Sequence, residues 1–455
     1  MRHEQFMLFA ALVVLVFLGA GVTVIVAVVE TDRMATTPST TTTSPQPPST
    51  TTPPPSTPSP TSQPLPEANC GAVTPISIES NAYFANESLQ FTGISAISLV
   101  NDGGIALGMQ LVRDFRGVVG LVEPEGVPVV SSQIEPEKIP LSFFGVTVAV
   151  TQDATIAAVG SAKPARVFVY ARRSLPNPLP YILVQTLEFG ANNEEKNRIP
   201  IAFNDDATVM AVGVPHLAQV IVYERKDNGP NEEPPFEYNE VQRINQTGCI
   251  GDTISQEFGF AIALDALAST LVIGNPQAAG VVCVYERTEN IFGLLHVLSP
   301  DNNVDTYFGH SVALTANALT VVVGAPDLTS DGPGHVHLFF FGDSASRPLL
   351  GTTSFAGQSA GDQMGYHVVI GGDLVVRIAT IGFPDKYIDP LLLTLNVTSV
   401  DFDSAYTASA ITVFDHQRAI ESIGVDSTDG TKFVAGYTGA VEMTKVGDVT
   451  TCLFD

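Results

Sequence analysis

Short apolar runs recur along residues 67–455, and Gly, Pro, Asn or Asp bounds most of them. The runs are rich in Val and Ile, as in 220–223 and 321–323, a composition typical of β-strands. Many are apolar at nearly every position. This pattern indicates strands that are buried on both faces, because a half-exposed strand would alternate apolar with polar residues. The region is therefore predicted to be all-β.

A repeat organises these strands. In its clearest copy, Phe308-Gly309 is followed 15 residues later by Gly324, which opens a Gly-Ala-Pro turn. Degenerate copies place Arg198 and Glu421 where the first glycine is expected. Seven second glycines follow one another at intervals of 50 to 61 residues. The motif glycines are Gly108, Gly145, Gly160, Gly213, Gly259, Gly274, Gly309, Gly324, Gly365, Gly382 and Gly436. Seven copies of a four-stranded unit predict a seven-bladed β-propeller over residues 67–455.

The motif glycines are expected to have steric roles. The first begins the innermost strand near the crowded axis of the propeller, where a side chain would clash. The second closes the next strand with a tight turn, to which Pro adds a fixed φ angle.

These blocks, with third strands such as Val220–Arg225 and Val282–Arg287, resemble the FG-GAP repeat of integrin α-subunit propellers and their bacterial, algal and viral relatives. The resemblance covers about residues 72–455 and implies an extracellular propeller for adhesion or ligand recognition. Many integrin blades also carry a calcium loop between the two blocks. Here the corresponding hairpins, such as 151–154 and 204–207, supply one or two carboxylates, whereas Ca²⁺ takes six to eight oxygens. No cofactor is expected.

The N-terminal region predicts a membrane anchor and a stalk. Residues 6–29 carry no charge and are long enough, as a helix, to cross a hydrocarbon core of about 30 Å. They are predicted to be a transmembrane signal anchor after a cytosolic tail at 1–5. The alternative is a cleaved signal peptide that leaves a secreted protein. Residues 30–66 are rich in Thr, Ser and Pro, which predicts a disordered stalk. Together they predict a single-pass type II membrane protein whose C-terminal propeller lies outside.

Charge limits the partners. The formal net charge of −26 excludes nucleic acid, because a phosphate backbone requires a basic surface. The expected partner is an extracellular protein or a glycan. Asn86, Asn245 and Asn396 begin Asn-x-Ser/Thr sequons and are candidate glycosylation sites.

The four cysteines allow two disulfides outside the cytosol. Cys70 precedes the first repeat and Cys452 lies near the C-terminus, so a closed ring would bring them together. Cys249 and Cys283 would then bond to each other. A buried free thiol at Cys283 is the alternative, because its repeat equivalents are Phe168 and Ile221.

Metal sites are weakly indicated. Asp301, Asn303 and Asp305 alternate as in an EF-type loop but lack its Gly and its distal Glu. Asp327 and Asp331 lie in a turn that is expected on the same face. A solvated acidic loop is the favoured interpretation, and a cation or a basic partner is the other.

We predict no catalytic residue. His335 and His337 share one face of a strand, but no third zinc ligand is near in sequence. The chain contains no H-E-x-x-H or P-loop motif. We expect a non-enzymatic module for adhesion or ligand recognition. The alternatives are a stalked enzyme acting on glycans or phosphoesters, and a structural coat or virion-surface protein.

Overall fold

The structure is a computed structural model of all 455 residues. It describes most of residues 143–371, with gaps at 173–180, 191–197, 251–254, 301–306 and a few shorter loops, and mainly the strands elsewhere. The chain divides into two compact units, Met1–Ser62 and Gln63–Asp455.

The smaller unit contains one β-hairpin. Strands β1 (Leu12–Leu18) and β2 (Gly21–Ala27) pair antiparallel, with Leu18 opposite Gly21. Both are rich in β-branched Val and Ile, which favour extended backbone. Among the described residues, no helix has the length and apolar character needed to span a membrane. The predicted transmembrane helix at 6–29 is therefore wrong, and so is the type II topology that rested on it. The tail at 1–5 and the stalk at 30–66 lie outside the described residues.

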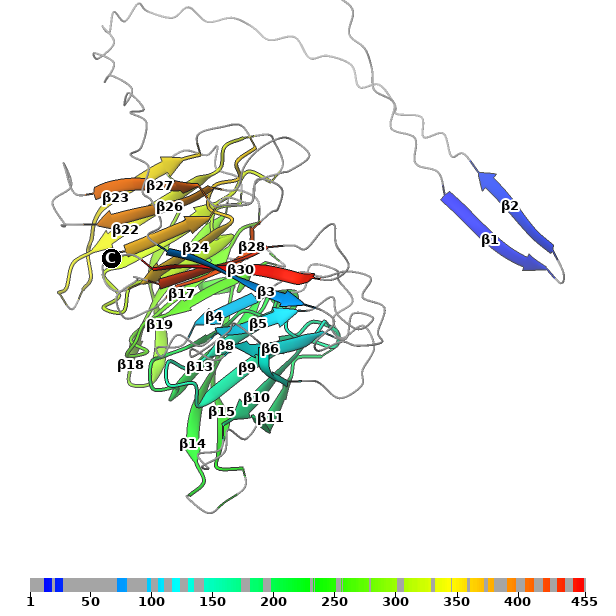
Figure 1. The fold of residues 1–455 in the computed structure, drawn as a ribbon, viewed down its shortest axis with the longest axis horizontal. Helices are drawn as coiled ribbons and strands as arrows, with labels where there is room; N and C mark the ends of the chain where they lie inside the picture. Colours follow the sequence, from blue (N-terminus) through cyan, green and yellow to red (C-terminus); the bar gives the residue numbers. More distant parts are fainter. Residues whose placement is uncertain are drawn as a thin grey trace, which may run out of the picture. The chain divides into compact units, whose positions relative to one another are not determined.

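The larger unit is a β-propeller built from four-stranded antiparallel sheets (Figure 1). Blade A comprises β4 (Ala96–Leu99), β5 (Ile105–Met109), β6 (Val118–Val122) and β7 (Val130–Ile134). Blade B comprises β8 (Thr147–Val150), β9 (Ile156–Ser161), β10 (Arg166–Ala171) and β11 (Ile182–Glu188). Blade C comprises β12 (Ile201–Phe203), β13 (Val209–Val214), β14 (Gln219–Asp227) and β15 (Phe236–Asn245). Blade D comprises β16 (Ala261–Leu264), β17 (Thr270–Asn275), β18 (Val281–Thr288) and β19 (Ile291–Leu298). Blade E comprises β20 (Ser311–Leu314), β21 (Thr320–Ala325), β22 (His335–Phe341) and β23 (Leu349–Ala356).

Two further sheets follow blade E. Sheet F comprises β24 (His367–Gly371), β25 (Val375–Ala379), β26 (Leu391–Val397) and β27 (Tyr406–Thr412). Sheet G comprises β28 (Ile420–Val425), β29 (Lys432–Tyr437), β30 (Lys445–Leu453) and β3 (Ala72–Glu79). β3 pairs with β30, with Val73 opposite Cys452, so a strand from near the start of the propeller completes a sheet of C-terminal strands (Figure 1).

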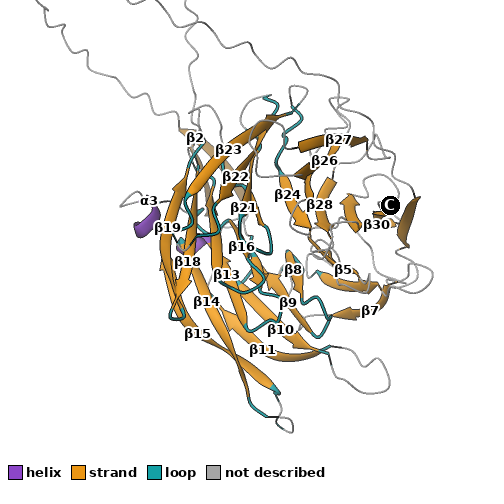
Figure 2. Ribbon diagram, turned by 90° about the vertical axis from the view of Figure 1, so that its left-hand side faces the viewer, coloured by secondary structure: helices purple, strands orange, loops and turns teal. Residues whose placement is uncertain are grey.

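Burial changes regularly across each blade. The second strands, such as β9, β13 and β17, are buried at every position, as the continuous apolar runs indicated. The innermost strands are mostly half-buried because they face the axis. The outermost strands alternate between buried and exposed residues. Two short helices interrupt the loops of blades C and D: η1 (Pro215–Leu217) and α3 (Thr247–Ile250), the latter beside β19 (Figure 2).

The packed core corrects the predicted blade count. The described residues form five hydrophobic clusters, each shared by two neighbouring sheets. They serve the five blades A to E, the last cluster being closed by Met364 and Val368 at the start of sheet F. The prediction of seven equivalent blades is therefore wrong, and the described core is that of a five-bladed propeller with four-stranded blades. The side-chain burial of the repeats containing Gly382 and Gly436 lies largely outside the described residues.

Side chains clamp neighbouring blades together at the rim. Gln185 in β11 donates to the carbonyl of Tyr238 at 3.0 Å and accepts from its N–H at 2.7 Å. Gln242 in β15 makes the same pair of bonds to Phe292 in β19, at 2.9 and 2.7 Å. Each glutamine therefore satisfies both backbone groups of one residue on the next outermost strand. This arrangement pairs polar groups that the blade interface would otherwise bury.

Candidate ligand-binding site

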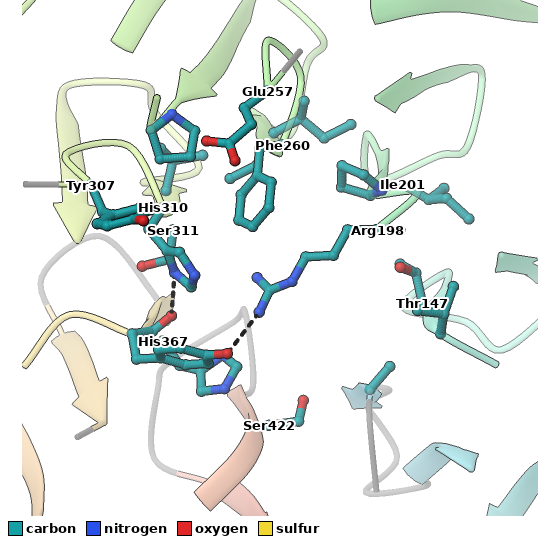
Figure 3. A pocket seen from close by; sticks show the side chains of 18 of the residues that line it. Thr147, Arg198, Ile201, Glu257, Phe260, Tyr307, His310, Ser311, His367 and Ser422 are labelled. Carbon is teal, nitrogen blue, oxygen red and sulfur yellow. Dashed lines mark hydrogen bonds between the residues drawn. The ribbon is translucent and has the colours of Figure 1, made fainter. Parts of the chain in front are cut away.

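A cavity of about 710 Å³ lies among the innermost strands. These strands contact one another in order, from β4 through β8, β12, β16 and β20 to β24 and β28. Each of them supplies a lining residue, or has one immediately beside it. The lining combines apolar side chains of Val, Ile, Ala, Leu, Pro and Phe with polar groups that include Arg198, Glu257 and His310 (Figure 3). A cavity of this size and character falls within the usual range of small-ligand sites.

The motif glycines explain how these residues reach the axis. The residue that follows the first glycine of a repeat lines the cavity in four copies: Val146, Phe260, His310 and Tyr366. The glycines before them adopt left-handed φ angles, between 85° and 91°, in the turn that begins the innermost strand. The second glycines, such as Gly274 and Gly324, lie within strands and not in the tight turn that was predicted for them. Sequence reasoning also missed the position after the first glycine. The sequence does contain a signal for this position, because the residue after each Phe-Gly or Met-Gly pair differs in chemistry from one repeat to the next.

Glycines of adjacent blades also fit against each other. A Cβ atom on Gly274 would lie well inside van der Waals contact with the carbonyl oxygen of Gly309, the first glycine of the next repeat. Gly213 and Gly324 meet the carbonyls of Gly259 and Gly365 in the same way. The two glycines of the repeat are thus steric partners across the blade boundary.

Arg198 breaks this pattern and enters the cavity. It occupies the place of the first glycine, and the contact with the preceding blade is relaxed there, since a Cβ on Gly160 would meet Ile199 O at an ordinary 3.4 Å. Its half-buried side chain extends across the cavity (Figure 3). The guanidinium carbon lies 4.9 Å from the centre of the Phe260 ring and 5.6 Å from that of Tyr366. One N–H donates to the Tyr366 hydroxyl at 3.5 Å.

His310 forms the opposite wall. It is 3% exposed, and its Nδ1 donates to the carbonyl of Tyr366 at 3.2 Å. Its ring packs against Phe260 and Tyr366, at centroid distances of 5.1 and 4.5 Å. Burial holds the pKa of His310 well below its usual value, and the positive charge of Arg198 and the presence of His367 lower it further. His310 is therefore neutral at neutral pH, and Arg198 is the fixed cation among the described lining residues.

The hairpins that were compared with calcium loops are held by internal hydrogen bonds. Thr151 Oγ1 accepts from the N–H of Ile156 at 3.0 Å, and Asn204 Oδ1 accepts from that of Val209 at 2.8 Å. Asp206 Oδ1 accepts from the amide and hydroxyl of Thr208, and these bonds lower the pKa of its carboxyl group. Backbone N–H groups and the Thr208 hydroxyl thus already bond to these oxygens.

Other predicted site residues are scattered. Among the described residues, no group of three His, Cys, Asp or Glu side chains is placed to hold a metal ion. Asp327 follows β21 and is half-buried. Asn245 ends β15 and is exposed, and Asn396 lies in β26. His335 and His337 lie on β22, where His337 packs edge-on against Phe308. The residues Asp301, Asn303, Asp305, Asp331, Asn86, Cys70 and Gly382 lie outside the described residues.

The cysteines of blade D form a disulfide. Cys249 in α3 and Cys283 in β18 are joined, with their Cα atoms 6.1 Å apart. Cys283 is fully buried, as its repeat equivalents Phe168 and Ile221 also are. The bond ties the exposed helix to the core of the blade.

Comparisons with known proteins support the fold. No family model matches the chain, and no curated protein matches it. Among solved structures, it is similar to the β-propeller domain of Myceliophteria thermophila Cps50 (Swd1), with a TM-score of 0.51, 11% identity, and coverage of 81% of this chain and 99% of that one. It is also similar to a chain of a mitotic checkpoint complex, with a TM-score of 0.52, 14% identity, and coverage of 86% and 96%. These similarities support the β-propeller fold.

Proposed function

We propose that this chain is a non-enzymatic recognition module that binds its ligand in the axial cavity around Arg198. One observation carries the proposal: a half-buried guanidinium is held between two aromatic rings in a cavity of ligand size. Preformed, largely apolar cavities with a few convergent polar groups are where ligands usually bind. A protein is the favoured ligand, and the similarity to a chain of a mitotic checkpoint complex is consistent with this choice.

The polar groups of the cavity favour binding over catalysis. The Ser311 hydroxyl donates to the carbonyl of Gly365 at 2.7 Å, so its proton is directed at the backbone and not at a base. His310 is almost fully buried, and its Nδ1 donates a hydrogen bond to the carbonyl of Tyr366. A nucleophile needs a base within hydrogen-bond reach to be activated. These groups instead fix the wall of the cavity.

The FG-GAP character of the repeat remains part of this proposal. The mutual fit of glycines such as Gly274 and Gly309 supports it, because it gives both blocks of the repeat one steric purpose. In this view the repeat builds the scaffold, and the residue after the first glycine varies with the ligand.

Binding to protein and glycan arrays tests the proposal. The full-length chain is compared with Thr147→Trp, which adds an indole at the cavity wall (Figure 3). Arg243→Met is the matched surface control, since Arg243 is exposed and pairs with Glu240 on the rim. We expect Thr147→Trp to weaken ligand binding at least tenfold and the control to have no effect. Equal binding by all three proteins would place the ligand outside the cavity and refute the proposal.

A further inference from the structure

Arg198 is a cation without a counter-ion in the described part of the chain. No carboxylate pairs with it there, and the bond to Tyr366 is its only hydrogen bond to the described residues. A guanidinium has five N–H donors in a rigid fork. The side chain that carries these donors extends into the cavity (Figure 3). The rings of Phe260 and Tyr366 fix the plane of the fork by cation–π contacts before any ligand arrives.

This geometry selects a planar anion. A carboxylate accepts two parallel N–H bonds from the fork, which makes such pairs shorter and stronger than neutral hydrogen bonds. The neutral state of His310 leaves Arg198 as the only fixed positive charge among the described lining residues. Glu257, at the same cavity, supplies a negative charge that would disfavour a second acidic group on the ligand.

The remaining lining indicates what carries the carboxylate. Around Arg198 lie apolar side chains such as Ile97, Ile262 and Val312. The hydroxyls of Ser311 and Tyr366 already bond to the protein, to Gly365 O and to Arg198. A sugar needs several polar partners for its hydroxyl groups, and an unpaired polar group costs free energy when it is buried. A peptide segment with one carboxylate beside apolar groups needs only the fork and the apolar wall. The net charge of −26 would repel a strongly acidic partner, so the segment belongs to a neutral or basic protein.

We propose that the axial cavity binds one carboxylate of a peptide segment, at a side chain or at the C-terminus, in a two-point contact with Arg198. This inference rests on the proposed function and adds the chemistry of the ligand. It makes Arg198 the residue that determines specificity, with Phe260 and Tyr366 as the residues that position it.

A matched pair of probes tests the inference. N-acetyl-phenylalanine carries a carboxylate, and N-acetyl-phenylalaninamide has the same body without the charge. Binding of each to the full-length chain is measured by saturation-transfer NMR and titration. We expect the acid to bind at least tenfold more tightly than the amide. Arg198→Met should remove that difference, Arg198→Lys should restore part of it, and Arg243→Met should leave it unchanged.

The outcomes separate the two proposals. If acid and amide bind equally and Thr147→Trp abolishes both, the cavity binds ligands but the carboxylate inference is wrong. If N-acetylneuraminate binds more tightly than the acid in an Arg198-dependent way, the ligand is a glycan and the peptide inference is wrong. If no probe binding responds to Thr147→Trp, the axial cavity is not the binding site and both proposals fail. Unchanged circular dichroism of each variant verifies that the fold is intact.

Discussion

The close contact between glycines of adjacent blades predicts that Gly274→Ala destabilises the protein. The added methyl group would meet the carbonyl oxygen and carbon of Gly309, which are backbone atoms. It has no flexible side chain to push aside, so blades D and E would have to separate locally. The hydrophobic cluster that they share, including Phe308 and Val323, would lose contact as they moved.

The magnitude follows from two opposing terms. Overpacking of a close-packed interior costs about 3 kcal/mol when backbone must shift. Replacing Gly by Ala within a strand returns about 0.5–1 kcal/mol of conformational entropy. Gly274→Ala should therefore lower the free energy of unfolding by about 2 kcal/mol. Gly160→Ala, at the same repeat position but beside Arg198, meets only an ordinary contact of 3.4 Å and should be neutral or slightly stabilising.

Urea unfolding of the two variants measures the difference. The chain has no Trp and 11 Tyr, so tyrosine fluorescence and near-UV circular dichroism report the transition. We expect the two free energies of unfolding to differ by about 3 kcal/mol, roughly a hundredfold in the folding equilibrium. If Gly160→Ala destabilises the protein as much as Gly274→Ala does, the glycine contact and its relaxation at Arg198 are not what shapes the blades.

Three further predictions concern stability. Because the pKa of His310 is lowered in the folded protein, the unfolded chain binds this proton first as pH falls. The contribution of His310 to the free energy of unfolding is therefore complete above about pH 6.5 and declines below it by up to about 1.4 kcal/mol per pH unit. His310→Phe should flatten this decline in acid titrations of the melting temperature, and an unchanged slope would contradict the assignment. Replacing Cys249 and Cys283 by Ser should cost about 3–4 kcal/mol, because the bond closes a loop with a sequence separation of 34; equal urea midpoints with and without reductant would argue against it. Gln242→Leu should cost about 2–3 kcal/mol by leaving both backbone groups of Phe292 unpaired, and hydrogen exchange at the Phe292 amide should speed up only if the clamp is real.

The sequence predicted the strands of the propeller but not how far its core extends. Runs such as 321–325 are apolar throughout, as expected for a strand packed between two sheets. The spacing of the glycines located the blade boundaries for the same steric reason. The spacing does not measure packing, however, so it did not give the number of blades.

The errors at the N-terminus and at the site have different physical causes. Hydrophobicity along 6–29 satisfies a membrane helix and a hairpin equally, and the excess of Val and Ile was the only local signal for strands. Arg198 was visible only as a missing glycine. Its meaning depends on Phe260 and Tyr366, which lie 62 and 168 residues away in the chain and meet it only when the innermost strands gather around the axis.

A crystal structure of the full chain with N-acetyl-phenylalanine tests the central claim most directly. The account predicts the ligand in the axial cavity, with both carboxylate oxygens within about 3 Å of the Arg198 guanidinium nitrogens and the ring against the apolar wall. An empty cavity with the ligand bound at the rim, or a ligand whose carboxylate points away from Arg198, would contradict it.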